Sequence, residues 1–362
     1  MPAGRIVIFG WATKQQIHAP RWATGLANRG FSIKLISLGG EPVEGVETCA
    51  LPRSGKLSYL TQIRAAAREA RRFNPDLVHA HYATGFGLWA YYTNLQPSIV
   101  SVWGSDIIDF PSTRVRRYMM GRILKRATHI TATSQLLKRK ALELLPEAGS
   151  KITVIPFGVE MPADPPPPPP DEPLRICFVK NLYPKYGPEI LLRALAEVRK
   201  EVPSVKLSMA GTGELEGLLR RMSTDLGLDD LVDFVGFVPH ERIYDFIGAH
   251  HLMVMPSMAE SESFGVAVLE AGACGRAVLA SRIGGVPEVV LDGETGRLLP
   301  PGDIGELASA IIALAGDRNT MQQMGRAGLD FVRDNYTWDK SLDMMAALYE
   351  RLIYEKAQNT SL

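Results

Sequence analysis

The sequence predicts an α/β protein with two doubly wound domains, each built on a parallel sheet, and three observations support this prediction. The chain has 362 residues, too many for one ordinary domain and suited to two of roughly 150–200 residues. Short β-branched runs alternate with amphipathic segments in both halves of the chain. Six consecutive prolines at residues 165–170 separate the two halves.

The first half alternates strands and helices. We expect strands at residues 5–9, 33–37, 77–80, 99–102, 129–132 and 152–155, and helices at 20–29, 57–73, 85–92, 114–126 and 135–145. In the second half we expect strands at 174–179, 205–210, 232–235, 252–255 and 277–280, and helices at 189–200, 215–226, 242–248, 264–273 and 304–315. Two further helices, at 319–334 and 338–355, close the chain. Alternation of this kind forms right-handed βαβ units, so each half is predicted to be a Rossmann-like domain.

Residues 161–173 are predicted to link a first domain at 1–160 to a second at 174–335. Proline fixes φ and lacks the amide donor, so this segment is expected to be an exposed, semi-rigid polyproline II spacer. A proline run can also dock into an aromatic groove, but the linker interpretation is favoured. Ligands bind beyond the carboxyl ends of parallel strands, and two facing sheets therefore predict a cleft between the domains.

Composition predicts a cytoplasmic protein. Apolar residues make up 46% of the chain and charged residues 22%, and no stretch reaches the roughly 18 apolar residues of a membrane span. Cys49, Cys177 and Cys274 are far apart and in no metal-ligand spacing, so we expect free thiols. Residues 1–160 carry 21 Lys and Arg against 10 Asp and Glu, whereas residues 161–362 carry 19 against 29. This asymmetry predicts an anionic partner for the first half.

The richest motif follows the strand expected at 252–255. It comprises Glu262, Ser263, Phe264, Gly265, Val266 and Glu270. A helix that begins at Phe264 leaves the first-turn amides free to bind a phosphate or a sugar hydroxyl. Glu262 and Glu270 lie about two helical turns apart, near one face, where carboxylates accept hydrogen bonds from vicinal hydroxyls. A dipole-complementing carboxylate followed by an ordinary surface Glu is the structural alternative.

This Glu-x7-Glu pattern, followed by Gly284, Gly285 and the segment 292–296, resembles the family 4 retaining glycosyltransferases of the GT-B fold. Residues 210–214 (AGTGE), 234–239 (FVGFVP), 155–160 (IPFGVE) and 336–338 (YTW) match the same family in order, so the resemblance covers essentially the whole chain. It implies two Rossmann-like domains facing across a cleft. It also implies that the C-terminal helix, within residues 336–362, packs back on the first domain.

The resemblance implies a role for each matching residue. Glu262 would bind the transferred sugar and Glu270 the ribose, as in the family. The remaining donor-binding positions would be Gly211, Gly213, Val238, Ser263, Phe264, Gly265 and Val266. The family's phosphate clamp is usually an Arg and a Lys, but those positions hold Asn181 and Tyr186 here, each preceded by a lysine. Because a diphosphate leaving group requires cations, Lys180 and Lys185 are the candidates, with solvated surface lysines as the alternative.

The first domain departs further from the family. The segment 10–18 lacks the usual Gly-Gly pair, and Trp103 stands where many members have an active-site His. The resemblance therefore assigns no catalytic histidine to this chain. His81 and Asp106 lie at strand ends, where acceptor contacts are built, although structural roles are also open to both. Together with His18 and Trp103 they are the acceptor-side candidates.

We therefore predict a glycosyltransferase that moves a sugar from a nucleoside diphosphate sugar, UDP favoured over GDP, to a glycan or lipid-linked acceptor in envelope or exported polysaccharide assembly. No Asp-x-Asp motif is present, so we expect neither a metal nor another cofactor. The departing phosphate would take the acceptor's proton, without a protein nucleophile. The alternatives are a nucleotide-sugar epimerase or hydrolase and a non-catalytic binding protein on the same fold. A dehydrogenase is disfavoured because no Gly-x-Gly-x-x-Gly follows the first strand.

A basic amphipathic helix is expected at residues 114–126. Its basic residues are Arg114, Arg116, Arg117, Arg122, Lys125 and Arg126, and its apolar residues include Val115, Tyr118, Met119, Ile123 and Leu124. Such a helix can lie at an anionic membrane surface, and we predict peripheral contact of this kind and no nucleic-acid partner. Two alternatives would explain the same pattern. The apolar side of the helix could pack against the core of its own domain, or the positive charge could steer the donor's diphosphate into the cleft.

Overall fold

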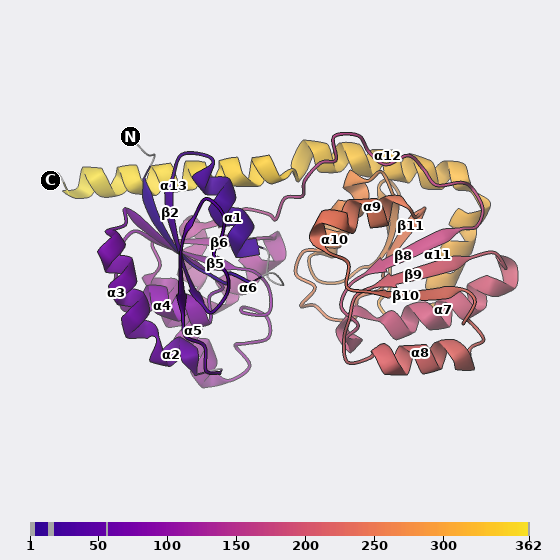
Figure 1. Cartoon of the computed structure of the whole chain (residues 1–362), viewed down its shortest axis with the longest axis horizontal. Helices are drawn as coiled ribbons and strands as arrows, with labels where there is room; N and C mark the ends of the chain where they lie inside the picture. The colour runs from indigo at the N-terminus through magenta and orange to yellow at the C-terminus, as the bar shows by residue number, and fades with distance from the viewer. Residues whose placement is uncertain (1–3, 14–17, 56, 361–362) are drawn as a thin grey trace. The chain divides into compact units, whose positions relative to one another are not determined.

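The computed structural model describes residues 4–13, 18–55 and 57–360, which form two compact units (Figure 1). The N-terminal unit consists of Met1–Pro156 together with Asp339–Leu362, and the C-terminal unit is Phe157–Trp338. Both units are α/β layers around one parallel sheet, so the predicted fold class is confirmed. No helix in the described ranges is long and apolar enough to span a bilayer.

The N-terminal unit contains a seven-stranded parallel sheet of order β3-β2-β1-β4-β5-β6-β7. Its elements are β1 (Arg5–Phe9), α1 (His18–Ala27), β2 (Ser32–Leu38), β3 (Glu47–Leu51), α2 (Ser58–Thr61), α3 (Ile63–Phe73), β4 (Leu77–His81), α4 (Gly85–Thr93), β5 (Ser98–Val102), α5 (Arg114–Arg126), β6 (His129–Ala132), α6 (Gln135–Leu144), the 3-10 helix η1 (Pro146–Lys151), β7 (Ile152–Val154) and α13 (Trp338–Thr360). The central strands β1, β4, β5 and β6 are almost fully buried, because helices cover both faces of the sheet.

The C-terminal unit repeats this plan with a six-stranded parallel sheet of order β10-β9-β8-β11-β12-β13. Its elements are β8 (Arg175–Val179), η2 (Pro184–Tyr186), α7 (Pro188–Glu201), β9 (Lys206–Ala210), α8 (Glu216–Asp225), β10 (Val232–Gly236), η3 (His240–Arg242), α9 (Ile243–Gly248), β11 (Leu252–Met255), α10 (Val266–Ala273), β12 (Ala277–Ser281), η4 (Val286–Glu288), β13 (Gly296–Leu299), α11 (Ile304–Gly316) and α12 (Arg318–Asn335). The strand order reverses between β8 and β11, so the topological switch point of this sheet lies there.

Three sequence predictions need correction. Strands β3 and β13 were not expected, because both are short edge strands without a clear apolar pattern. The single helix expected at residues 57–73 is two helices, α2 and α3, that meet at Gln62. The helix expected from Phe264 begins at Val266, because Gly265 takes a left-handed conformation with φ of 91° as its N-cap.

The C-terminal helix α13 packs within the N-terminal unit. The Tyr349 hydroxyl and His79 Nδ1 lie 2.6 Å apart, and both side chains are completely buried. Nearer its start, Asp339 and Asp343 both accept hydrogen bonds from the Arg29 guanidinium of the segment that follows α1. Helix α13 therefore completes the core of the unit whose strands lie far from it in the sequence.

The proline segment is mostly exposed but is attached to the C-terminal unit. The buried Arg276 donates hydrogen bonds from Nη2 to the carbonyls of Pro166 and Pro167, at 2.8 and 2.7 Å. Arg318 donates to the carbonyl of Asp171 at 2.9 Å. Two arginines thus hold the main chain of this mostly exposed segment against the C-terminal unit.

Candidate active site

The carboxyl ends of β8 and β11 place two of the predicted motifs at the switch point of the C-terminal sheet. The loop after β8 carries Lys180 and Lys185, and the loop after β11 carries Glu262 and Ser263. Because β8 and β11 are adjacent, parallel strands, these loops leave the sheet side by side.

The glycine turn after β9 supports the loop after β8. A Cβ at Gly211, whose φ is 148°, would lie 2.0 Å from the Lys180 carbonyl oxygen, so only glycine fits there. Main-chain hydrogen bonds join the two loops, from Lys180 N to the Ala210 carbonyl and from Leu182 N to the Thr212 carbonyl. A Cβ at Gly213 would lie 2.4 Å from the Leu182 carbonyl oxygen. Gly211 and Gly213 thus allow the glycine turn to pack closely against the backbone that carries Lys180.

Lys180 and Glu262 form a buried ion pair at the carboxyl ends of β8 and β11. Lys180 Nζ lies 2.8 Å from Glu262 Oε2, with 19% of the lysine side chain and 7% of the glutamate side chain exposed. Burial lowers the pKa of Lys180, but the neighbouring Glu262 and Tyr186 outweigh this effect and hold the pKa above its usual range. Lys180 is therefore a cation at neutral pH, and it is one of the groups that the sequence predicted for the diphosphate.

Tyr186 lies between the two candidate lysines. Lys180 Nζ is 5.2 Å and Lys185 Nζ 4.9 Å from the centre of its ring, within the range of cation–π contact. Lys185 is exposed, and its carbonyl accepts a hydrogen bond from the amide of Met258, in the loop after β11. Tyr186 was not among the predicted site residues.

Helix α10 begins beside this pair. The first-turn amides belong to Val266 and the residues after it, and Gly265 precedes the helix, which shifts the predicted anion-binding point by two residues. Phe264 is 3% exposed, and its ring packs 5.8 Å from that of Tyr336. The side chain of Phe264 therefore serves packing, and only its main chain is available to a ligand.

Glu270 lies on α10, and His240 Nδ1 is 3.7 Å from its Oε1. His240 follows the loop after β10, which also carries the predicted residue Val238. Glu270 is 7% exposed, so it requires polar partners. Sequence reasoning missed His240; its position directly after the 234–239 motif was the signal that could have found it.

The predicted acceptor-side residues gather at the carboxyl ends of β4 and β5 in the N-terminal unit. The ring of Trp103 lies 4.7 Å from that of His81 and 5.9 Å from that of His18. His81 is 1% exposed, and among the described residues neither of its ring nitrogens has a hydrogen-bond partner. Burial, together with His79 and His18, lowers the pKa of His81 well below its usual range, so this ring is neutral.

Asp106 supports the loop after β5. Its Oδ1 accepts hydrogen bonds from the amides of Trp103 and Gly104, and its Oδ2 accepts one from Ala83, at 2.8–3.1 Å. Burial raises the pKa of Asp106, against the opposing effect of these amides. The structure thus gives Asp106 a positioning role, and its contact with an acceptor stays a prediction.

A cavity of about 430 Å³ opens beside Asp106. Aromatic and polar side chains line it, namely Trp11, Tyr59, Tyr82, Thr84, Ser105, Asp106, Asp109 and Phe110. Tyr82 has a φ of 74°, a conformation that costs a non-glycine residue roughly 1–3 kcal/mol and is enriched at functional sites. Trp11, Tyr59 and Tyr82 were not predicted, because their convergence depends on three separate segments: the loop after β1, helix α2 and the turn after β4.

Comparison with known proteins identifies the family. The model of the family described as glycosyl transferases group 1 matches residues 163–331, and that described as glycosyl transferase 4-like matches residues 8–134. The C-terminal unit belongs to the group 1 glycosyl transferases, and the two glycosyl transferase models together match most of the chain. The predicted family is thereby confirmed.

Individual relatives of this chain carry glycosyltransferase names. It is 37% identical over 177 residues to a GDP-mannose-dependent alpha-(1-6)-phosphatidylinositol monomannoside mannosyltransferase of Mycolicibacterium smegmatis, an alignment that spans 46% of the chain and 45% of the relative. It is 25% identical over 349 residues to a D-inositol 3-phosphate glycosyltransferase of Kribbella flavida, which spans 88% of the chain and 81% of the relative. The alignment with the mannosyltransferase thus spans less than half the length of that relative.

The fold of this chain is also that of solved GT-B structures. Sucrose-phosphate synthase from Thermosynechococcus elongatus superposes with a TM-score of 0.83 at 21% identity, over 97% of the chain and 99% of that protein. In the described part of the chain, no three His, Cys, Asp or Glu side chains are grouped as metal ligands would be.

Proposed function

We propose that this protein transfers a sugar, with retention, from a nucleoside diphosphate sugar to a glycan or lipid-linked acceptor. The observation that carries the proposal is the Lys180–Glu262 ion pair at the switch point of the C-terminal sheet. Glu262 accepts hydrogen bonds from hydroxyls of the transferred sugar, while Glu270 holds the ribose. Both carboxylates come from one loop-and-helix segment, Glu262 from the loop after β11 and Glu270 from α10.

Stabilisation of the leaving diphosphate is the main electrostatic task in this mechanism. As the bond to the anomeric carbon breaks, negative charge grows on the phosphate oxygens, and Lys180, Lys185 and the first-turn amides of α10 stabilise it. The phosphate oxygen takes the proton of the acceptor hydroxyl as that hydroxyl attacks from the same face. No protein nucleophile and no metal take part in the proposed step.

The donor's base is tested with a panel that includes GDP-mannose and UDP-glucose. The comparisons do not support the predicted preference for UDP over GDP, since a relative 37% identical is named GDP-mannose-dependent. We therefore propose GDP-mannose as the first donor to test. Isothermal titration of each nucleotide sugar, followed by mass spectrometry of products with lipid-linked inositol acceptors, identifies the pair.

The assay also separates the competing functions. Sugar transfer that requires an acceptor, and that persists in EDTA, supports the proposal. Rapid conversion of the donor without any acceptor would identify an epimerase or hydrolase instead. Donor binding without turnover towards any acceptor in the panel would point to a non-catalytic binding protein.

For the acceptor we propose the cavity beside Asp106. Aromatic rings can cover the apolar faces of sugar rings, and Asp109 at the same cavity offers carboxylate acceptors to hydroxyls. A Tyr82→Ala variant is expected to raise the acceptor KM while donor affinity, measured by calorimetry, stays unchanged. A loss of donor affinity of the same size would contradict this assignment.

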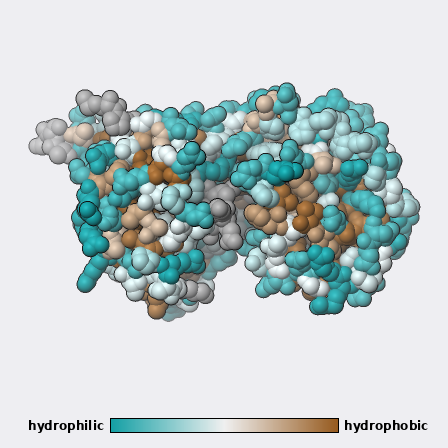
Figure 2. Space-filling view, viewed as in Figure 1, coloured by the Kyte–Doolittle hydropathy of each residue, from teal (hydrophilic) through white to brown (hydrophobic). Residues whose placement is uncertain are grey.

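We also propose peripheral contact with an anionic membrane through α5. Met120, Ile123 and Leu124 face the core, whereas Val115 and Tyr118 are each 69% exposed between the basic residues. On the face shown in Figure 2, brown hydrophobic residues lie among teal hydrophilic ones in both units. The helix is anchored at its C-terminal end, where Lys151 Nζ donates to three main-chain carbonyls within residues 124–127.

Liposome flotation tests this contact. Each basic residue near an anionic leaflet contributes about 1 kcal/mol, so we expect binding to anionic vesicles that salt reverses, and none to neutral vesicles. Val115→Ser with Tyr118→Ser should weaken binding at low salt, and Leu218→Ser, an exposed residue of the other unit, is the control. Protein that stays in solution with anionic vesicles at low ionic strength would overturn this part of the proposal.

A further inference from the structure

Tyr186 is the last residue of η2, the short turn between β8 and α7. Two contacts fix this turn to the loop after β11. The amide of Met258 donates a hydrogen bond to the Lys185 carbonyl at 2.8 Å. Gly187, with φ of 65°, packs so closely that a Cβ there would lie 2.1 Å from the Pro256 carbonyl oxygen. The ring of Tyr186 also packs against the hydrophobic core of the C-terminal unit, so it has a fixed position at the candidate active site.

Two lysine ammonium groups lie over this ring. Lys180 Nζ is 5.2 Å and Lys185 Nζ 4.9 Å from the ring centre, and the electron-rich face of an aromatic ring attracts cations at such distances. Lys180 Nζ is also 2.8 Å from Glu262 Oε2. A lysine side chain carries about 2 kcal/mol of rotamer entropy, so an ammonium group without such neighbours samples many positions. The ring therefore restricts where the two charges lie.

The chemistry of this contact preserves the positive charge of the site. A carboxylate neutralises the lysine that it binds, so the pair of Lys180 and Glu262 has no formal net charge. An aromatic ring stabilises an ammonium group through the ring quadrupole and leaves the positive charge in place. Because Lys185 also contacts the Tyr186 ring, both ammonium groups are held while the site keeps a positive formal charge for an anionic ligand.

We propose that Tyr186 is a positioning residue for the diphosphate of the donor. Its ring holds in place the two ammonium groups, those of Lys180 and Lys185, that stabilise the leaving diphosphate in the proposed function, on which this inference rests. Tyr186 acts through these lysines, and contact between its own side chain and the donor is not required. The alternative is a ring that only fills space beside the core, and its electron density would then have no effect on nucleotide binding.

Phenylalanine analogues with one, two or three ring fluorines, placed at position 186 of the full chain by nonsense suppression, test the contact. Each fluorine withdraws electron density from the ring face and changes the shape little, so the attraction for a cation weakens stepwise. GDP and UDP are titrated calorimetrically into each variant. We expect Tyr186→Phe to bind within about twofold of the wild type, and diphosphate affinity to fall about three- to tenfold along the fluorine series. The matching monophosphates should be affected less.

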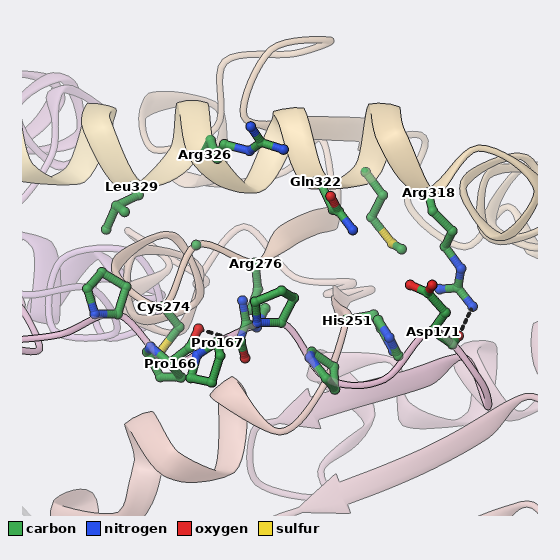
Figure 3. A pocket seen from close by; sticks show the side chains of 15 residues that line it. Pro166, Pro167, Asp171, His251, Cys274, Arg276, Arg318, Gln322, Arg326 and Leu329 are labelled. Carbon is green, nitrogen blue, oxygen red and sulfur yellow. Dashed lines mark hydrogen bonds between the residues drawn. The ribbon is translucent and has the colours of Figure 1, made fainter.

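Tyr186→Leu removes the ring and should weaken binding of the same nucleotide by about tenfold. In a Lys180→Met background the same change should weaken binding less, because one of the two cations is already absent. Tyr91→Leu is the matched control, since its ring lies 4.9 Å from the Arg126 guanidinium in the N-terminal unit and its loss should not affect nucleotide binding. Arg326→Gln removes an exposed cation from the groove between α12 and the proline segment (Figure 3), and it should also bind as the wild type does.

The outcomes separate this inference from the proposed function. Diphosphate affinity that stays constant along the fluorine series would overturn the role of Tyr186, while nucleotide binding itself would leave the proposed function standing. Equal losses from Tyr186→Leu in the wild-type and Lys180→Met backgrounds would also overturn it, since the ring would then act independently of Lys180. Wild-type protein that binds neither GDP nor UDP would contradict the proposed function and this inference together. Circular dichroism confirms that each variant is folded.

Discussion

Replacing Lys180 with methionine should destabilise the C-terminal unit and also slow turnover, for separate reasons. The substitution keeps most of the side-chain volume but leaves the Glu262 carboxylate, only 7% exposed, without the cation 2.8 Å away. Breaking a buried ion pair from one side costs about 3–5 kcal/mol, and the 19% exposure of Lys180 places this pair near 3 kcal/mol. For a unit of this size that loss lowers the Tm by about 6–12 °C.

Pairing the substitution with Glu262→Gln separates the two effects. The double variant has no uncompensated charge, so its stability should return to within about 1 kcal/mol of the wild type. Turnover should stay reduced by tenfold or more, about 1.4 kcal/mol, because the diphosphate still lacks its cation and the transferred sugar lacks the Glu262 carboxylate. Lys200→Met is the control: its ion pair with Glu197 is exposed, and its loss should cost under about 1 kcal/mol.

Urea denaturation measures the stabilities, and nucleotide release in the presence of acceptor measures turnover. Recovery of wild-type turnover in the double variant would refute the reasoning, since Lys180 would then serve only to neutralise Glu262. A Lys180→Met variant as stable as the wild type would refute the assigned burial cost.

Three further outcomes are expected. Glu270→Gln should weaken nucleotide binding by about 1.5–3 kcal/mol in calorimetry and affect turnover at saturation less, whereas equal losses would argue against a ribose contact. Lys185→Ala should reduce turnover more than about tenfold and weaken diphosphate binding more than monophosphate binding; equal effects would point to a different clamp. Burial lowers the pKa of His79 to about 3 and that of His129 to about 4, so the free energy of unfolding should fall by up to about 1.4 kcal/mol per pH unit for each ring as pH drops from 6.5 toward 4. His129→Gln should make this slope shallower, and an unchanged slope in urea titrations would contradict it.

Local patterns in the sequence were sufficient to predict both sheets and most of their strands. Buried parallel strands are continuous apolar runs, and the helices between them have a regular apolar face. Each element can therefore be recognised from a few neighbouring residues in the sequence. Strands β3 and β13 were not predicted because their sequences, ETCAL and GRLL, contain no run of β-branched residues. The donor segment around Glu262 and Glu270 was visible for the same local reason, since both residues and the following helix are contiguous.

Contacts between distant loops were decided by the tertiary structure alone. The sequence indicated two lysines near Tyr186, but only the adjacency of β8 and β11 brings Lys180 to Glu262. In the same way, His240 reaches Glu270 through the packing of two separate segments. Proline chemistry by itself predicted an exposed spacer; the sequence carried no sign that Arg276, a buried cation more than a hundred residues later, would bind its carbonyls. Hydrophobic periodicity is a property of residues close together in the sequence, so it predicts helices and strands. Ion pairs, and hydrogen bonds from side chains to distant carbonyls, depend instead on which strand ends the fold brings together.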